Sequence, residues 1–124
     1  MMNTWHNLAA IKVNASSGDT GRWATKRQIG AVAGRLGKLI EELLASRFGL
    51  SAGKEYVRNL RLRFLNDVLP NGGWRGDGVL TSANQLSFGE ASAILDWLES
   101  DSAAEDLAVW LAAQNAPHAR EMFE

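Results

Sequence analysis

Apolar residues recur along this chain mainly at spacings of three and four, which is the pattern of helices with one apolar face. Thr25-Lys-Arg-Gln28 has the residue order of a capping box and predicts that a helix begins there, with Thr25 as its N-cap. Phe48-Gly49 predicts that the helix ends at a C-cap glycine. The predicted apolar face between these ends consists of Ile29, Val32, Ala33, Leu36, Leu39, Ile40, Leu43 and Leu44.

Three glycines, Gly30, Gly34 and Gly37, interrupt this predicted helix. Each glycine costs about 1 kcal/mol relative to alanine in a helix interior. Two interpretations follow. Either Gly37 ends a first helix and Lys38 starts a second one, or the glycines allow another helix to approach closely.

A second basic and apolar segment predicts the next helix. Ser51 is its predicted N-cap, and Pro70-Asn71-Gly72-Gly73 ends it, because proline cannot continue a helix. A glycine-rich loop is predicted over residues 70–80. The apolar side of the helix consists of Val57, Leu60, Phe64, Leu65 and Val68.

Two further capping boxes, Ser87-Phe-Gly-Glu90 and Ser102-Ala-Ala-Glu105, predict two more helices, the second of which stops at Asn115-Ala116-Pro117. Three capping boxes without a convincing pair of strands predict an all-α bundle of four or five helices over residues 24–116, followed by a tail over 117–124. The inward positions of the two last helices are Ala91, Ile94, Leu95, Leu98, Leu107, Trp110 and Leu111.

Residues 1–23 are weakly patterned and are predicted to form an N-terminal arm or flap. Ala9, Ile11 and Val13 alternate with polar or small neighbours, which favours one short strand. Trp5 and Trp23 flank this arm and are expected to pin it to the bundle.

The 124 residues, 46% of them hydrophobic, fit one globular domain. No apolar run approaches the roughly 20 residues of a membrane span, and the first residues lack the features of a signal peptide, so no membrane partner is expected. The absence of cysteine suits a reducing cytosol, and the predicted location is cytoplasmic.

Charge changes the picture, because it is split along the chain. Residues 22–75 hold eleven of the 13 basic residues and four acids, a net charge of +7, whereas residues 76–124 hold nine acids and one base, a net charge of −8. A molecule of this kind can offer one surface to phosphate and another to a basic partner.

The basic half carries the candidate nucleic-acid site, and a solvated helix surface is the alternative. Lys54, Arg58 and Arg61 follow at i, i+4 and i+7 and share one side of their helix. Trp74 in the glycine-rich loop is a candidate for stacking on an unpaired base, for anchoring a protein interface, or for plugging the bundle. The full candidate set is Arg47, Lys54, Arg58, Arg61, Arg63, Trp74 and Arg75.

The acidic half carries the candidate protein-binding residues, again against the alternative of a solvated surface. Their spacing is not that of a known metal site, and His6 and His118 are too isolated for zinc. Trp97 and Trp110 are expected in the core, with Trp97 partly exposed beside the main apolar stripe. The candidate acids are Asp96, Glu99, Asp101, Glu105 and Asp106.

Ala24-Thr25-Lys26-Arg27-Gln28, the small-residue helix ending Leu36-Gly37, and the stretch from Ser82 to Leu98 form a spaced pattern. It resembles a small helical module of phage and plasmid proteins that act in DNA recombination or single-strand annealing. The resemblance covers about three fifths of the chain and implies an all-α module associated with the DNA metabolism of mobile elements. It provides no catalytic residues, and it does not extend to the basic helix and glycine loop of residues 50–80 or to the acidic helix after residue 100.

No catalytic triad, paired carboxylates or nucleotide motif stands out, so the prediction is a non-enzymatic protein without a cofactor or small-molecule substrate. The leading hypothesis is a nucleic-acid-associated module that binds DNA or RNA without sequence preference and contacts a protein of a nucleoprotein complex through its acidic helices. One alternative is a phage or plasmid inhibitor of a host defence nuclease that mimics nucleic acid. Another is a helical small subunit of an RNA-guided complex.

Overall fold

The computed structural model describes residues 8, 11, 23–69 and 80–114. In chain order the elements are α2 (Lys26–Phe48), α3 (Lys54–Val68), a short 3-10 helix η2 (Ala83–Gln85), α4 (Phe88–Leu98) and α5 (Ala103–Ala113). The predicted all-α bundle is confirmed. In these described ranges the β-type pairing is confined to one isolated bridge, between Trp23 and Ser87.

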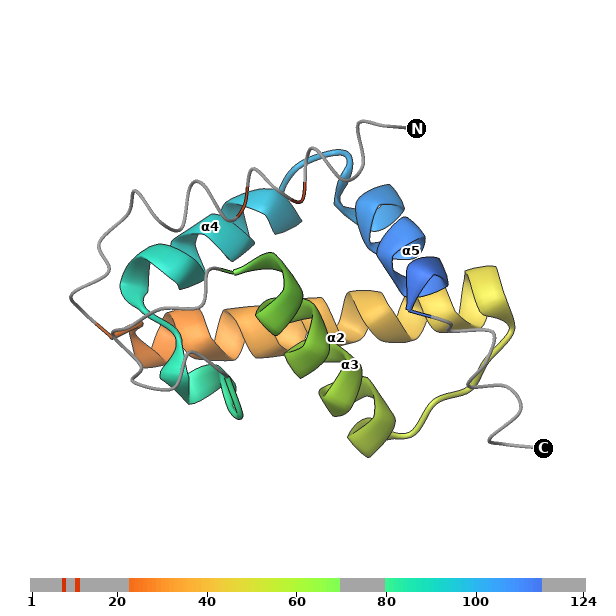
Figure 1. Ribbon diagram of the computed structural model, residues 1–124, viewed down its shortest axis with the longest axis horizontal. Coiled ribbons are helices and arrows are strands. Elements are labelled where there is room, and N and C mark those ends of the chain that lie inside the picture. Colours follow the sequence, from red (N-terminus) through yellow and green to blue (C-terminus); the bar gives the residue numbers. More distant parts are fainter. Residues whose placement is uncertain (1–7, 9–10, 12–22, 70–79, 115–124) are drawn as a thin grey trace.

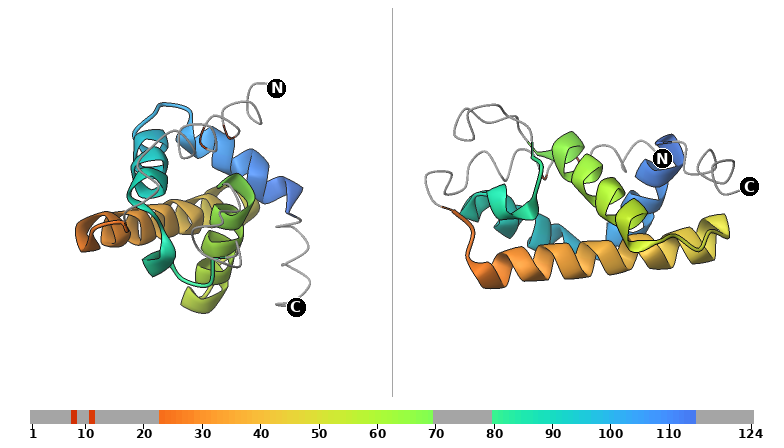
Figure 2. Two further views of the ribbon diagram at one scale, coloured as in Figure 1. Left: turned by 60° about the vertical axis from the view of Figure 1, so that its left-hand side comes forward. Right: turned by 90° about the horizontal axis from the view of Figure 1, so that it is seen from below.

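The other helices of the bundle pack against the long helix α2. It runs along the molecule, α3 crosses it, and α4 and α5 pack against it further round (Figures 1 and 2). Thr25 caps its start as predicted, since the side chain accepts from the Gln28 N–H and the Gln28 side chain accepts from the Thr25 N–H. Gly49 ends it in the left-handed conformation, with φ of 65°.

The two interpretations of the α2 glycines are now separated. α2 is one continuous helix, so Gly37 does not break it. Gly37 is buried against α3, and a β-carbon added there would lie 3.4 Å from Nη1 of Arg61 and 3.8 Å from Cγ1 of Val57. Gly37 therefore lies at the contact with α3, where a β-carbon would make ordinary van der Waals contacts, whereas Gly30 and Gly34 have no neighbouring atom within 4 Å.

The start of α3 differs from the prediction. Its N-cap is Gly53 rather than Ser51, and no side chain caps it. The C-terminal end was predicted correctly, because α3 stops at Val68 just before Pro70. Asn66 links this end to the later chain, since its side chain donates to the Leu80 carbonyl at 2.9 Å and accepts from the Leu80 N–H at 2.8 Å. This pairing holds the two ends of the segment 70–79 together.

Of the two later capping boxes, one is confirmed and one is wrong. Ser87 and Glu90 make both reciprocal hydrogen bonds at the start of α4. Ser102 precedes α5 but makes no capping hydrogen bond, because its backbone is in the right-handed helical region rather than the extended region that caps require. Its hydroxyl instead donates to Oδ2 of Asp106 at 3.0 Å.

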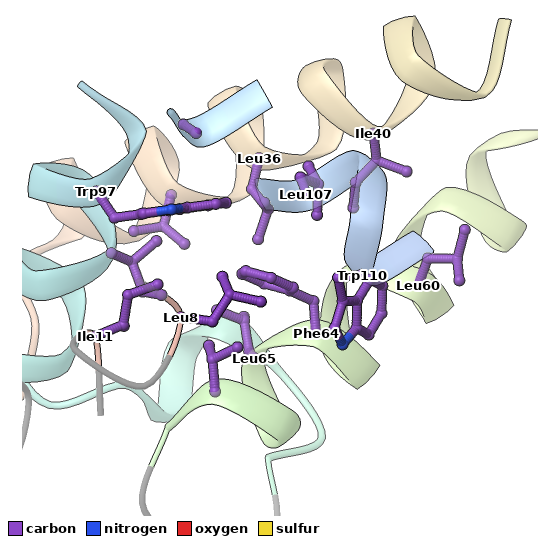
Figure 3. Close-up of a cluster of buried hydrophobic side chains, with 14 of the residues drawn as sticks. Leu8, Ile11, Leu36, Ile40, Leu60, Phe64, Leu65, Trp97, Leu107 and Trp110 are labelled. Carbon is purple, nitrogen blue, oxygen red and sulfur yellow. The ribbon is translucent and has the colours of Figure 1, made fainter. Parts of the chain in front are cut away.

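Three aromatic residues organise the core. Phe64 of α3 lies between Trp97 of α4, stacked at 5.2 Å between ring centroids, and Trp110 of α5, edge-on at 5.1 Å (Figure 3). The expectation that Trp97 is partly exposed is wrong, since it is only 6% exposed. Its position beside the α4 stripe is covered because α5 folds back and offers Asp106 to the indole N–H.

Leu8 and Ile11 belong to the same core, with 3% and 2% exposure (Figure 3). Both positions are helical, so Ile11 is not part of the predicted strand. Their spacing of three places two side chains on one side of a helix, which is how both reach the bundle. Ala9 and Val13, the other residues of that prediction, lie outside the described residues.

A candidate phosphate-binding groove between α2 and α3

A groove of about 390 Å³ lies where α3 crosses α2. On the α2 side the groove is lined by Gly34 and Gly37, which have no side chains to fill it. Its walls carry the long polar side chains of both helices. The charged residues that line it are Lys38 and Glu41 from α2 and Lys54, Arg58 and Arg61 from α3.

The helical repeat explains why these cations meet. Residues i, i+4 and i+7 lie on one side of a helix, and the buried Val57 sits among them and turns that side of α3 toward α2. At this crossing Arg61 lies against the α2 backbone, with Gly37 and the Ala33 carbonyl as its neighbours. The predicted trio Lys54, Arg58 and Arg61 is therefore brought together.

Arg61 is the most unusual of these residues because it is half-buried. Its Nη1 donates to the Ala33 carbonyl at the long distance of 3.5 Å, and its Nε is buried without a hydrogen-bond partner. Burial lowers the pKa of Arg61, and the neighbouring positive charge of Arg58 lowers it further. Both effects disfavour the charged guanidinium. Keeping Arg61 charged in the folded protein therefore carries a desolvation cost in free energy.

No described carboxylate compensates for this charge by an ion pair. Among the residues that the structure describes, the ion pairs join Arg35 to Glu99 and Arg47 to Glu105, and both lie away from the groove. Glu41 lines the groove, but it lies one helical turn beyond Gly37, toward the Lys54 end. The Arg61 end is therefore the more electropositive one.

Of the other predicted nucleic-acid residues, the described ones, Arg47 and Arg63, do not line this groove. Arg63 is exposed and lies about 200° around α3 from Arg61. There it neighbours Tyr56, whose pKa is raised by burial and lowered in smaller part by Arg63. Arg47 is held by Glu105 at 2.9 Å. Trp74 and Arg75 lie outside the described residues.

Lys38 lines the groove but was missing from the sequence-based candidate set. The signal that could have found it is its place next to Gly37. A helix that packs against a glycine also lies close to the residues next to that glycine in the sequence. Reading the glycines as the contact point with α3 would have put Lys38 next to the α3 cations.

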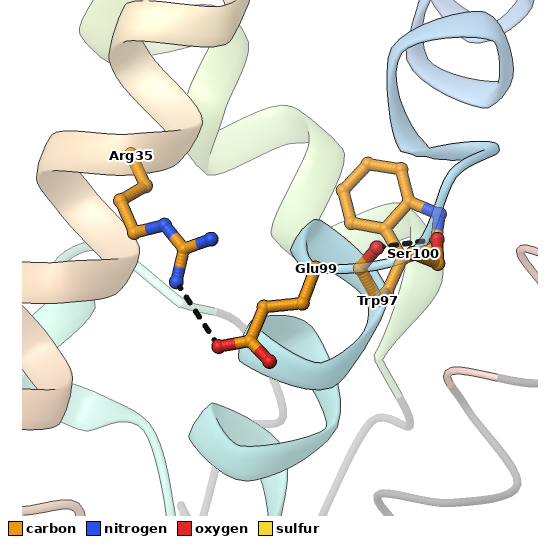
Figure 4. Close-up of polar contacts among 4 residues, drawn as sticks. All are labelled: Arg35, Trp97, Glu99 and Ser100. Carbon is orange, nitrogen blue, oxygen red and sulfur yellow. Dashed lines mark hydrogen bonds and ion pairs between the residues drawn. The ribbon is translucent and has the colours of Figure 1, made fainter.

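The predicted acidic surface is divided by the structure. Asp106 is only 2% exposed and accepts hydrogen bonds from Nε1 of Trp97 and Oγ of Ser102, so it is not part of an exposed acidic surface. Glu99 faces Arg35 at 3.7 Å, beside the Ser100 hydroxyl that donates to the Trp97 carbonyl (Figure 4). Of the five candidate acids, Asp96 and Asp101 are exposed and make no ion pair among the described residues.

A second groove, also about 390 Å³, lies where α2 faces the end of α4. Arg35, Lys38 and Glu42 supply its charges, and Leu39 and Leu98 supply apolar walls. The Arg35 guanidinium at its edge is paired with Glu99, so this groove has less uncompensated positive charge than the one between α2 and α3.

The described parts of the chain contain no group of three His, Cys, Asp or Glu side chains placed to hold a metal ion. None of the helices in those parts is both long enough and apolar enough to cross a membrane. Comparison of the chain with protein-family models, curated proteins and solved structures gives no match.

Proposed function

We propose that this protein is a non-enzymatic nucleic-acid-associated module, of the phage or plasmid type that its sequence resembles, and that the groove between α2 and α3 binds phosphate. The observation that carries this proposal is the set of four cations around one groove with Glu41 as the acid among them. Guanidinium groups bind phosphate with paired hydrogen bonds, and the phosphate backbone dominates the affinity of most nucleic-acid-binding proteins.

The state of Arg61 favours phosphate binding over a merely solvated helix surface. A solvated arginine keeps water around all of its N–H groups, whereas Arg61 is half-buried and its Nε is out of contact with solvent. An external anion would supply the missing charge and relieve the cost of burial. The exposed carboxylates of Asp96 and Asp101 would repel phosphate. We propose that these two residues contact a protein of the same cytoplasmic nucleoprotein complex.

Binding to nucleic acid is tested by fluorescence polarisation with single- and double-stranded DNA and RNA at two salt concentrations. We expect binding that weakens as salt rises, because each neutralised phosphate releases counterions. Arg58→Gln should weaken binding several-fold, since it removes one groove cation. Arg63→Gln, on the other side of α3, is the matched control and should bind like the parent.

Two outcomes would contradict the proposal. One is the absence of binding to all four nucleic acids at low salt. The other is an equal loss of affinity in Arg58→Gln and Arg63→Gln, which would show that overall charge matters and that the groove does not. Circular dichroism and thermal melting of both variants establish that each is folded.

A further inference from the structure

Three cations line the groove near the contact between Arg61 and α2. Arg61 contacts Ala33, and Gly37 lies against both Arg61 and Val57, so this part of α2 faces the middle of α3. Lys38 follows Gly37 directly, and Arg58 is one turn from Arg61. Glu41 lies one turn beyond Gly37 and lines the same groove. Among the described residues, Lys38, Arg58 and Arg61 make no ion pair with a carboxylate.

The charge of this end suits one class of phosphate better than another. A phosphodiester in a nucleic-acid backbone carries a single negative charge. A phosphate monoester carries about −1.5 to −2 at pH 7 and has three strong acceptor oxygens. Three cations that line one groove and make no ion pair to a described carboxylate are matched more closely by the monoester.

The volume of the groove is large enough for a phosphate monoester. At about 390 Å³ it lies near the lower end of the range for sites that enclose a small molecule, roughly 300–1,000 Å³. A volume of this kind accommodates one terminal group.

We propose that the Arg61 end of the groove binds a phosphate monoester, as found at the phosphorylated end of a nucleic-acid strand or in a free nucleotide. This inference rests on the proposed function and makes it more specific: the protein would recognise strand ends in preference to strand interiors. Arg61 would donate from its terminal nitrogens to phosphate oxygens, while Lys38 and Arg58 would neutralise the remaining charge.

The experiment is a competition assay with unlabelled single strands of one sequence. The competitors are a 5′-phosphorylated strand, a 3′-phosphorylated strand and a strand with hydroxyls at both ends. A mononucleotide and inorganic phosphate are tested in parallel, because they offer the same chemistry without a strand. We expect a phosphorylated strand to compete about tenfold better than the dihydroxyl strand, the effect of one good charge-assisted contact.

Arg61→Lys gives the sharper test, because it keeps the charge and removes the planar fork together with Nε. In this variant we expect the phosphorylated and dihydroxyl strands to compete almost equally well. The affinity for the dihydroxyl strand should stay close to that of the parent. Arg63→Lys is the matched control on the other side of α3 and should keep the full preference. Thermal melting of both variants checks that the fold is intact.

The outcomes separate this inference from the function on which it rests. Equal competition by all three strands overturns the end-binding inference and leaves nucleic-acid binding in place. Equal competition by the mononucleotide and the phosphorylated strand supports the monoester site but contradicts a nucleic-acid function. A preference that survives Arg61→Lys contradicts the role of Arg61, and no competition by any compound overturns both proposals.

Discussion

The basic groove and the acidic helix pair use their charges in opposite ways. Around the groove, Lys38, Arg58 and Arg61 lie close together without an ion pair to any described acid. On α4 and α5 most of the acids are already engaged within the protein. Asp106 is buried and hydrogen-bonded, and Glu99 faces an arginine.

This comparison teaches that a net charge counted along a sequence does not give the charge of a surface. Residues 76–124 carry −8 and residues 22–75 carry +7, yet Glu90 caps α4 and Asp106 holds an indole. Several of the basic residues, in contrast, line one groove where α3 crosses α2. Predictions that separate engaged from unengaged charges therefore test the comparison directly.

The largest effect is expected where an acid is most engaged. Asp106→Ala should lower the free energy of unfolding by about 3 kcal/mol, because it leaves the buried indole N–H of Trp97 without its acceptor and removes a hydrogen bond to a charged group. Asp101→Ala, at an exposed position on the same side of the bundle, should stay within about 0.5 kcal/mol of the parent. Urea unfolding measures both.

Asp106→Asn separates hydrogen bonding from charge, because the amide oxygen can still accept from Trp97. Its cost should be smaller than that of Asp106→Ala. If Asp106→Ala and Asp101→Ala are equally mild, the acidic helices present a uniform solvated surface and the comparison is wrong on that side.

The helices and their caps were the predictable part of this structure, since they depend on short-range patterns. The capping boxes at Thr25 and Ser87 and the glycine at 49 were all readable from a few adjacent residues. Ser102 shows the limit of such motifs. The same residue order fits a cap, yet its hydroxyl is directed to Asp106 by the fold of α5 against α4.

The groove was only partly predictable, because it depends on how two helices cross. The i, i+4, i+7 spacing put Lys54, Arg58 and Arg61 on one side, which is a local property. The sequence did not show that this side faces α2 and half-buries Arg61. Because Arg61 lies against the Ala33 carbonyl, we expect reversal of its charge to destabilise the fold.

The second prediction concerns the unengaged charge at Arg61. Arg61→Met should raise the free energy of unfolding by roughly 1 kcal/mol, because it removes a poorly solvated cation and keeps the apolar packing of the side chain. The gain is well below that for a fully buried charge, since the guanidinium keeps some contact with water. The same variant should lose phosphate binding.

Arg63→Met is the matched control, because Arg63 is exposed on the other side of α3. It should change stability little and keep phosphate binding. Chemical unfolding in a buffer without phosphate or sulfate is the measurement, so that no anion masks the effect. A loss of stability in Arg61→Met would mean that the protein itself satisfies Arg61.

The third prediction concerns the glycines that shape the groove. Gly34→Ala should stabilise the protein by about 0.5–1 kcal/mol, because alanine favours the helix and the added β-carbon meets no atom within 4 Å. Gly37→Ala should gain less or nothing, since its β-carbon would lie 3.4 Å from Nη1 of Arg61. Thermal unfolding compares the two, and an equal gain in both would show that Gly37 is not a contact point for α3.

The smallest effect is expected from the exposed ion pairs that join α2 to the acidic helices. A double-mutant cycle with Arg47→Gln and Glu105→Gln should give a coupling free energy of roughly 0.3–0.5 kcal/mol that falls as salt rises, because both side chains are about half exposed or more. The pair between Arg35 and Glu99, at 3.7 Å, should couple more weakly still. Such small values would mean that Glu99 and Glu105 neutralise charge on α2 without fixing the fold. A coupling above 1 kcal/mol for Arg47 and Glu105 would contradict this, since the acidic helices would then be structural partners of the basic half rather than a weakly attached counter-charge.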